Sequence, residues 1–373
     1  MQSDSTLYQS FGGMDACRRL SETFYGRAQR DPVLRPLFPS LHCAVESFTV
    51  YLAQLLGGPS DYSKRRWSLS LREAHLRFKI GPKERAAWLK NMRSALDQME
   101  TPERLRDALQ GFFERSSAGL VNRGEAQLTG AIPTELARQW DVHAAIEDIV
   151  ATVRNGDADR AVVMAESPIL VEHFEHDRAA LLSLLALMSA SGMHDYVRRR
   201  LLADPALARE SYTRGRTLLH GAAGAGSVEV VELLLTLGAD PDAIDQAGHA
   251  PLYCVGNECN APGGGEVVRA LARAGANLDA RDGVKHCTAL HMAARRGNVE
   301  VAEALLDCGA NLEAHDSKGE TPLRRAVNCS KISLVALLLK RGADPDTRAT
   351  GGRTTFEAAR QPAIKALLES YRR

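Results

Sequence analysis

A recurring Gly-Ala-Asp or Gly-Ala-Asn triplet is the feature that most constrains how this chain can fold. The triplets start at Gly238, Gly275, Gly309 and Gly342, at spacings of 37, 34 and 33 residues. A glycine at such a position can take a left-handed conformation and cap the preceding helix. A helix pair of this length cannot bury its own apolar face, so neighbouring repeats must stack. The period therefore predicts a solenoid of helix pairs over the C-terminal half.

A second landmark precedes each triplet and marks where a helix starts. The four segments begin at Thr217, Ala250, Thr288 and Thr321, and they read TLLH, APLY, TALH and TPLR. A threonine followed by proline suits a first helical turn. Together the two landmarks resemble the ankyrin repeat, which has a period of about 33 residues and a Thr-Pro-Leu-His signature. The resemblance implies an array that binds another protein.

Four repeats are clear and span residues 214–350, and residues 351–373 resemble a closing cap. Residues 145–213 resemble one or two degenerate repeats, with inter-helix turns expected at residues 155–157 and 191–194. The 37-residue repeat carries its extra residues at 257–265, where glycines favour a surface loop. A binding role for that loop stays open.

Residues 1–128 lack this period and instead show amphipathic helical stripes. Leu20, Phe24 and Ala28 form one stripe, and Gly81-Pro82 is typical of a helix start. We expect three more helices, with apolar stripes at 44–55, 88–99 and 105–120. Residues 129–144, which contain Gly130 and Pro133, are expected to link this domain to a repeat domain at 145–373.

Charge and cysteine content argue against several classes of partner. The formal net charge is +1, so no overall field attracts nucleic acid or an anionic membrane. The seven cysteines are scattered and form no CxxC pair, which favours reduced thiols. The N-terminus shows no basic region followed by an apolar one, so we expect a cytoplasmic protein.

Residues 7–122 carry an ordered set of short motifs that resembles the group II truncated haemoglobins, a two-over-two helical globin family. In chain order, the matching segments are Tyr8 with Gly12-Gly13, Phe24-Tyr25, Asp31-Pro32-Val33-Leu34, Leu37-Phe38-Pro39, Gly57-Gly58-Pro59, Tyr62-Ser63, Arg66, Leu71-Arg72, His75, Phe78, Ile80-Gly81, Glu84-Arg85, Trp88-Leu89 and Met92. The resemblance implies an all-α fold: a truncated globin followed by an ankyrin solenoid.

One segment departs from the family pattern. Members usually carry Gly-His-Pro-Arg after the arginine matched by Arg66, whereas this chain reads Trp67-Ser68-Leu69-Ser70. The resemblance is therefore weakest in the loop that precedes His75, and it still holds at His75 itself.

The resemblance implies haem b, an iron protoporphyrin, as cofactor. His75 would be the proximal iron ligand. Tyr25 and Trp88 would be hydrogen-bond donors to a diatomic ligand on the distal side. His42 is read as a surface residue, although a role as a sixth ligand stays open.

Further haem-binding residues follow from the same resemblance. Phe38 would stack on the porphyrin, Phe48 would add distal bulk, and Ala44 would leave ligand entry open. Phe78 is expected to contact the haem. Arg66 and Arg72 are candidates to bind the haem propionates, since arginine suits carboxylates.

Three functions are compatible with these sequence features. The first is reversible binding of oxygen, nitric oxide or carbon monoxide for sensing or delivery, with the ankyrin array docking a protein. The second is a haem enzyme with nitric oxide dioxygenase or peroxidase activity that uses an external reductant. The third is a scaffold without haem, which the combination of His75, Tyr25, Phe38 and Trp88 disfavours. A zinc site at His286, Cys287 and His291 is also disfavoured, because His291 occupies the structural histidine position of its repeat.

Overall fold

The computed structural model describes residues 7–37, 41–59, 61–62, 75, 78–121 and 134–372, with backbone alone at 41–43 and 134–140. Within these ranges the regular elements are all helical, and extended pairing is limited to two isolated bridges, Ser211–Thr217 and Arg348–Thr354. None of the described helices combines the length and apolar composition needed to span a bilayer. The all-α expectation is therefore confirmed.

The N-terminal helices pack around one apolar core. They are α1 (Leu7–Phe11), α2 (Gly13–Ala28), α3 (Leu41–Leu55), α6 (Pro82–Leu96) and α7 (Glu103–Ala118), with a 3-10 turn at Arg35–Leu37. The expected stripe of Leu20, Phe24 and Ala28 is fully buried, and α2 packs on both α3 and α6. Burying side chains of this size contributes about 1.5–3 kcal/mol each. Helix α2 is therefore the central helix of the domain.

Polar contacts hold α6 in place at both of its flanks. The Gly81 amide donates to Glu84 Oε2 at 2.9 Å, which caps the helix start just before Pro82. Asn91 Nδ2 donates to Asp31 Oδ2 at 2.8 Å, and Arg85 Nε donates to Ser117 Oγ at 3.1 Å on α7. The first residues of α6 therefore follow the expected proline-started helix, and its orientation is fixed by side-chain hydrogen bonds.

The segment after the core does not follow a simple linker pattern. One helix, α8 (Thr134–Arg154), starts inside the expected linker 129–144 and continues past residue 145. It packs against α7 and also against α9 (Ala158–Ala165) and α10 (Pro168–His176). The chain divides into two compact units, Met1–Ser183 and Leu184–Arg373. A boundary of independent folding at residue 145 stays a prediction.

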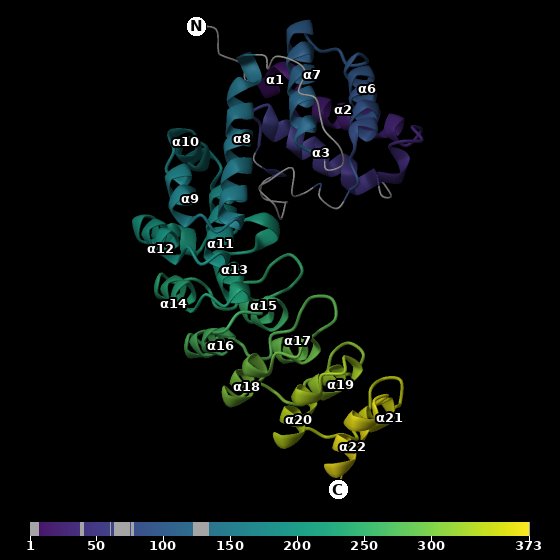
Figure 1. Cartoon of the computed structure of the whole chain (residues 1–373), viewed down its shortest axis with the longest axis vertical. Helices are drawn as coiled ribbons and strands as arrows, with labels where there is room; N and C mark the ends of the chain where they lie inside the picture. The colour runs from purple at the N-terminus through teal and green to yellow at the C-terminus, as the bar shows by residue number, and fades with distance from the viewer. Residues whose placement is uncertain are drawn as a thin grey trace. The chain divides into compact units, whose positions relative to one another are not determined.

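The C-terminal unit is an array of helix pairs stacked in chain order (Figure 1). Its inner helices pack on one another, as do its outer helices. The inner helices are α13 (Leu218–Ala225), α15 (Pro251–Glu258), α17 (Ala289–Arg296), α19 (Pro322–Asn328) and α21 (Thr355–Ala358). The outer helices are α14 (Val228–Thr236), α16 (Gly264–Arg273), α18 (Val299–Asp307), α20 (Ile332–Lys340) and α22 (Pro362–Ser370).

The expected turns lie where the repeats predict them. Each of the four triplet glycines has a left-handed φ between 83° and 99° after its outer helix. Gly156 and Gly192 have the same hand, and α11 (Arg178–Ala190) and α12 (His194–Ala203) flank the second of these turns. The turns between helices that the sequence predicts are therefore confirmed both in the clear repeats and upstream of them.

The expected surface loop at 257–265 was only partly right. Helix α15 continues to Glu258 and α16 begins at Gly264, while Cys259, Gly264 and Gly265 are buried. A Cβ on Gly264 would approach Val301 Cγ2 to 2.7 Å. The glycines therefore serve close packing of α16 on its neighbour, and the exposed residues of this segment are Glu258 and 260–262.

Two buried histidines tie successive repeats together. The Thr288 amide donates to His291 Nδ1 at 3.2 Å, and His291 Nε2 lies 2.9 Å from the Glu320 carbonyl oxygen of the next repeat. His220 does the same with the Thr217 amide, at 3.1 Å, and the His249 carbonyl, at 2.9 Å. With Nδ1 accepting and Nε2 donating, each ring is held neutral. Burial lowers the pKa of both histidines.

Acid should therefore destabilise the repeat array. As the pH falls below about 6.5, the unfolded chain takes up a proton at each of these histidines, whereas the folded array does not. The contribution of the two neutral histidines to the free energy of unfolding is therefore fully present above that pH and is lost as the pH falls below it. We expect the urea midpoint followed by circular dichroism to be lower at about pH 5 than at neutral pH. The variant His220→Asn/His291→Asn should show a flatter pH dependence, and His315→Gln, an exposed control, should keep the wild-type slope. Equal midpoints at both pH values in the wild type would refute this account.

Candidate functional site

Three of the expected distal residues come together from three different helices. Tyr25 lies on α2, Phe48 on α3 and Trp88 on α6. The Tyr25 and Phe48 rings are 6.0 Å apart and perpendicular, and the Phe48 and Trp88 rings are 6.4 Å apart at 89°. Edge-to-face contacts of this kind add about 0.5–1.5 kcal/mol each beyond burial. The fold thus gathers a phenol and an indole around one phenylalanine.

Phe24 is the residue that joins this aromatic cluster to the core. It is fully buried, and its ring centroid lies 4.9 Å from that of Tyr25, 5.2 Å from that of Trp88 and 6.0 Å from that of Phe48. Successive residues on a helix point about 100° apart, so Phe24 enters the core while Tyr25 flanks it. Tyr25 itself is 8% exposed. The local sequence Phe24-Tyr25 therefore supplies an anchor and a neighbouring polar tip.

Two members of the aromatic cluster were not predicted from the sequence. Phe113 on α7 lies 5.5 Å from Trp88 and 6.1 Å from Phe48, and Tyr51 on α3 stacks 6.0 Å from Phe48. Tyr51 was detectable, because it follows Phe48 by one helical turn. Phe113 lies off the predicted stripe of its helix, and it is buried because its ring packs against Phe48 of α3 and Trp88 of α6.

The expected proximal residues are in contact with each other. His75 has helical backbone and is partly exposed, and its ring centroid lies 6.0 Å from that of Phe78. The Phe78 amide donates to the His75 carbonyl oxygen at 2.9 Å. Ala44 packs on the apolar core beside α2. Phe38, Arg66 and Arg72 lie outside the described residues, as does the side chain of His42.

The described residues fit a haem by their chemistry. His75 offers an imidazole, which is a common haem iron ligand. The aromatic rings of α2, α3, α6 and α7 provide an apolar lining, and Tyr25 and Trp88 provide two hydrogen-bond donors. Within the described ranges, no group of three or more His, Cys, Asp or Glu side chains is placed to hold a metal ion. A single-histidine haem suits this donor set better than a metal site made of protein ligands alone.

The zinc alternative in the array gains no support from the geometry. His291 is fully buried with Nδ1 and Nε2 both occupied by the hydrogen bonds described above. Burial also raises the pKa of the Cys287 thiol. These residues therefore serve the packing of the repeat, in agreement with the expectation from the sequence.

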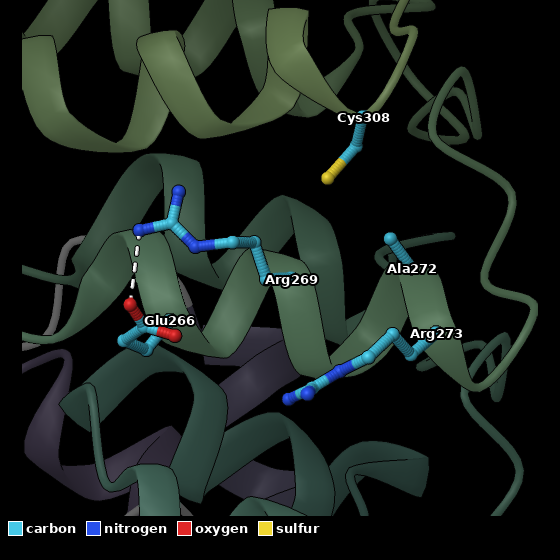
Figure 2. A pocket seen from close by; sticks show the side chains of 5 residues that line it. All are labelled: Glu266, Arg269, Ala272, Arg273 and Cys308. Atoms are coloured by element: carbon cyan, nitrogen blue, oxygen red, sulfur yellow. Dashed lines mark hydrogen bonds and ion pairs between the residues drawn. The ribbon is translucent and has the colours of Figure 1, made fainter.

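A shallow hollow of about 340 Å³ lies on the outer helices of the array (Figure 2). Its lining residues are Glu266, Arg269, Ala272, Arg273 and Cys308. Arg269 donates to Glu266 at 3.0 Å, and Arg273 pairs with Glu232 at 3.1 Å. Both arginine charges are thus compensated within the array, and the hollow offers no histidine for a haem.

Comparison with known proteins decides the family of the N-terminal domain. The bacterial-like globin family matches residues 6–121. The group 2 truncated hemoglobin YjbI of Bacillus subtilis is 34% identical over 127 residues, which cover 34% of this chain and 96% of that protein. The chain belongs to the group 2 truncated haemoglobins. Its globin domain is followed by ankyrin repeats, which confirms the fold and the resemblance inferred from the sequence.

The repeats of this truncated haemoglobin also match known families. An ankyrin repeat matches residues 214–246, and a model of three ankyrin repeats matches residues 257–349. Ankyrin repeat and SOCS box protein 16 of Homo sapiens is 34% identical over 175 residues, and 26S proteasome non-ATPase regulatory subunit 10 of Mus musculus is 40% identical over 68 residues. The matches cover 45% and 18% of this chain, and the chain spans 37% and 29% of those relatives. They support protein interaction by the array.

Proposed function

We propose that this truncated haemoglobin binds oxygen, nitric oxide or carbon monoxide at a haem b ligated by His75, and that its ankyrin array docks the domain to a protein, for sensing or delivery of the gas. When bound, the haem supplies an iron centre that takes a small diatomic ligand. The observation that carries the proposal is the meeting of Tyr25, Phe48 and Trp88 from α2, α3 and α6 in a globin domain.

Each residue of the chain has a distinct task in this proposal. The His75 imidazole would hold the haem iron. The Tyr25 Oη–H and the Trp88 Nε1–H would donate to a bound diatomic ligand, and such a bond to a charged acceptor is worth about 1.5–3 kcal/mol. Phe48 and Phe24 keep water away from the donors, which strengthens both bonds because the local dielectric is low. Ala44 leaves room for ligand entry, and Phe38, Arg66 and Arg72 are proposed to contact the porphyrin and its propionates.

The Tyr25→Phe variant tests this distal assignment. Loss of one donor should raise the oxygen dissociation rate about tenfold or more, because the hydrogen bond is lost while the ring is kept. Autoxidation should also accelerate. Stopped-flow oxygen release from wild type, Tyr25→Phe, Trp88→Phe and the double variant forms a double-mutant cycle that isolates the coupling between the donors.

Tyr371→Phe is a control for that cycle, because it removes a phenol hydroxyl from an exposed residue of the other compact unit, away from the proposed donors. Its oxygen release should match the wild type. If Tyr25→Phe releases oxygen and autoxidises at wild-type rates, Tyr25 is not the distal donor and the site must be rebuilt around Trp88.

A further inference from the structure

The array presents five finger loops, residues 210–216, 243–250, 280–287, 314–320 and 346–353, each just before an inner helix. In Figure 1 these loops project beside α13, α15, α17, α19 and α21. Backbone hydrogen bonds join each finger to the next. The Gln246 amide donates to the Arg214 carbonyl at 2.9 Å, and the Gly283 amide donates to the Ala247 carbonyl at 3.1 Å. The fingers therefore form one continuous row.

The same ladder continues through the later fingers and fixes which side chains are equivalent. The Ser317 amide donates to the Lys285 carbonyl at 2.8 Å, and the Thr350 amide donates to the Lys318 carbonyl at 3.0 Å. The four accepting residues hold one structural position, and three of them, Arg214, Lys285 and Lys318, are cationic. A repeated position in a solenoid points the same way in each repeat, so these charges line one surface.

The fully exposed charged residues of the finger row are cationic, apart from its histidines. They are Arg214, Arg281, Lys285, Lys318, Arg348 and Arg353, whereas the acids of the five fingers are buried or partly exposed, with 40% of the Asp346 side chain accessible. We refer to these six residues as the basic row. The chain as a whole carries a formal charge of only +1. The charges are therefore sorted by the fold and are not a consequence of composition.

Three aspartates of the fingers are turned inward by their turn geometry. Asp245, Asp282 and Asp316 are buried. Their Oδ1 atoms each accept two backbone amides at 2.7–3.1 Å, such as Lys285 and Cys287 for Asp282. Glu320 pairs with Arg325 at 3.2 Å and Asp346 with Arg372 at 3.0 Å. These carboxylates belong to the fold. Glu357 on α21 lies near Arg348 and Arg353, so the positive charge of the row is concentrated on the third and fourth fingers, at Arg281, Lys285 and Lys318.

The outer helices show the opposite arrangement. Their exposed acids include Glu229, Glu232, Glu266, Glu300, Glu303 and Asp307. Their arginines lie in ion pairs with those acids: Arg269–Glu266 at 3.0 Å (Figure 2), Arg273–Glu232 at 3.1 Å and Arg341–Asp307 at 2.8 Å. An anionic partner is therefore attracted to the fingers and not to the outer face.

Two large apolar side chains interrupt the basic row. Ile244 is 67% exposed and Val284 is 72% exposed, on adjacent fingers. Apolar side chains in a cationic surface suit a peptide with both acidic and apolar residues. A phosphate backbone would leave them without a partner, and the exposed residues of the five fingers include no Phe, Tyr or Trp ring on which a base could stack.

We infer that the finger row binds an extended acidic segment of a partner protein, with Asp or Glu side chains on the basic row and an apolar side chain against Ile244 and Val284. This inference rests on the docking role proposed above for the array and names the chemistry of its partner. Complementary charge would set the approach and the register, and the apolar contact would add affinity.

A displayed library of random peptides selected on the immobilised full chain tests this surface. We expect the enriched peptides to be rich in Asp and Glu and to carry apolar residues, and their affinity to fall with salt. The variant Arg281→Glu/Lys285→Glu/Lys318→Glu should bind them at least about tenfold more weakly, since three favourable pairs become repulsive. The matched control Arg269→Glu/Arg273→Glu/Arg341→Glu makes the same change in net charge on the outer helices and should bind as the wild type does.

Other outcomes would overturn the inference in distinguishable ways. Neutral or basic peptides, or binding that survives the finger variant, would leave docking intact and remove the basic row from it. Tighter binding of a labelled single-stranded DNA or of phosphatidylserine vesicles than of any selected peptide would assign the row to another class of partner. Failure to enrich any peptide would contradict the docking function itself, whereas the haem spectrum of each variant should stay that of the wild type.

Discussion

The His75→Ala variant should lose its haem iron ligand, with iron content and the Soret band both falling to near background. The reason is chemical: the iron needs a basic nitrogen on its proximal side, and alanine offers none. The Phe78 ring lies 6.0 Å from that of His75, and it has no atom that could replace the imidazole as an iron ligand. We expect far-UV circular dichroism to retain the helical signal of the repeats, because they form a separate compact unit.

A cavity variant separates loss of the ligand from loss of the fold. His75→Gly should recover a Soret band when imidazole is added, since the free base can enter the vacated space and bind the iron. His315→Ala removes an exposed histidine from a finger and should leave the spectrum unchanged. A His75→Ala protein with wild-type iron content and spectra would contradict the assignment of His75.

Phe24→Ala should be the most destabilising single change in the globin domain, at about 3–5 kcal/mol. Phe24 is fully buried and contacts the rings of Tyr25, Phe48 and Trp88, so its removal leaves a cavity beneath the distal cluster. A domain of this kind is stable by only about 5–15 kcal/mol, so the loss is a large part of the total. Urea unfolding followed by the Soret band should show a much lower midpoint and weaker haem retention.

The control for this change keeps most of the volume. Phe24→Leu should cost clearly less than Phe24→Ala, because a branched apolar side chain refills much of the space. Phe24→Ala with a wild-type midpoint would mean that the aromatic cluster does not depend on Phe24.

The repeats were readable from the sequence because their structure is local and periodic. A glycine must follow each outer helix, and the histidines at 220 and 291 must bridge to the next repeat, so both leave a fixed spacing. The glycine-rich insertion was misread because the same residue type also serves close packing. Gly264 lies against Val301, a contact made across repeats that no spacing rule encodes.

The aromatic cluster shows a different limit of sequence reasoning. Helical periodicity selects one buried face per helix, so a stripe that includes Phe112 excludes its neighbour Phe113. Phe113 is nevertheless buried, against Phe48 of α3 and Trp88 of α6, and the pattern of a single helix cannot show contacts with other helices. Tyr25, Phe48 and Trp88 were named only because the family resemblance supplied their roles, since each alone reads as an ordinary half-buried aromatic residue.

The basic row could not be found from composition for a physical reason. Asp282 and Lys285 lie three residues apart in one finger, and in the sequence their charges cancel. In the fold, the aspartate accepts the Lys285 amide and is buried, while the lysine side chain is exposed. Which of the two charges lies on the surface is therefore decided by the turn and cannot be read from the order of residues.

The absorption spectrum of the purified full chain tests the central claim most directly. Recorded in the ferric, ferrous and ferrous carbon monoxide states, it reports both haem content and the ability of the iron to take a diatomic ligand. We predict a Soret band in all three states that shifts when carbon monoxide is added to the ferrous protein. A folded chain that shows no Soret band after titration with haem, or a ferrous spectrum that carbon monoxide leaves unchanged, would contradict the account.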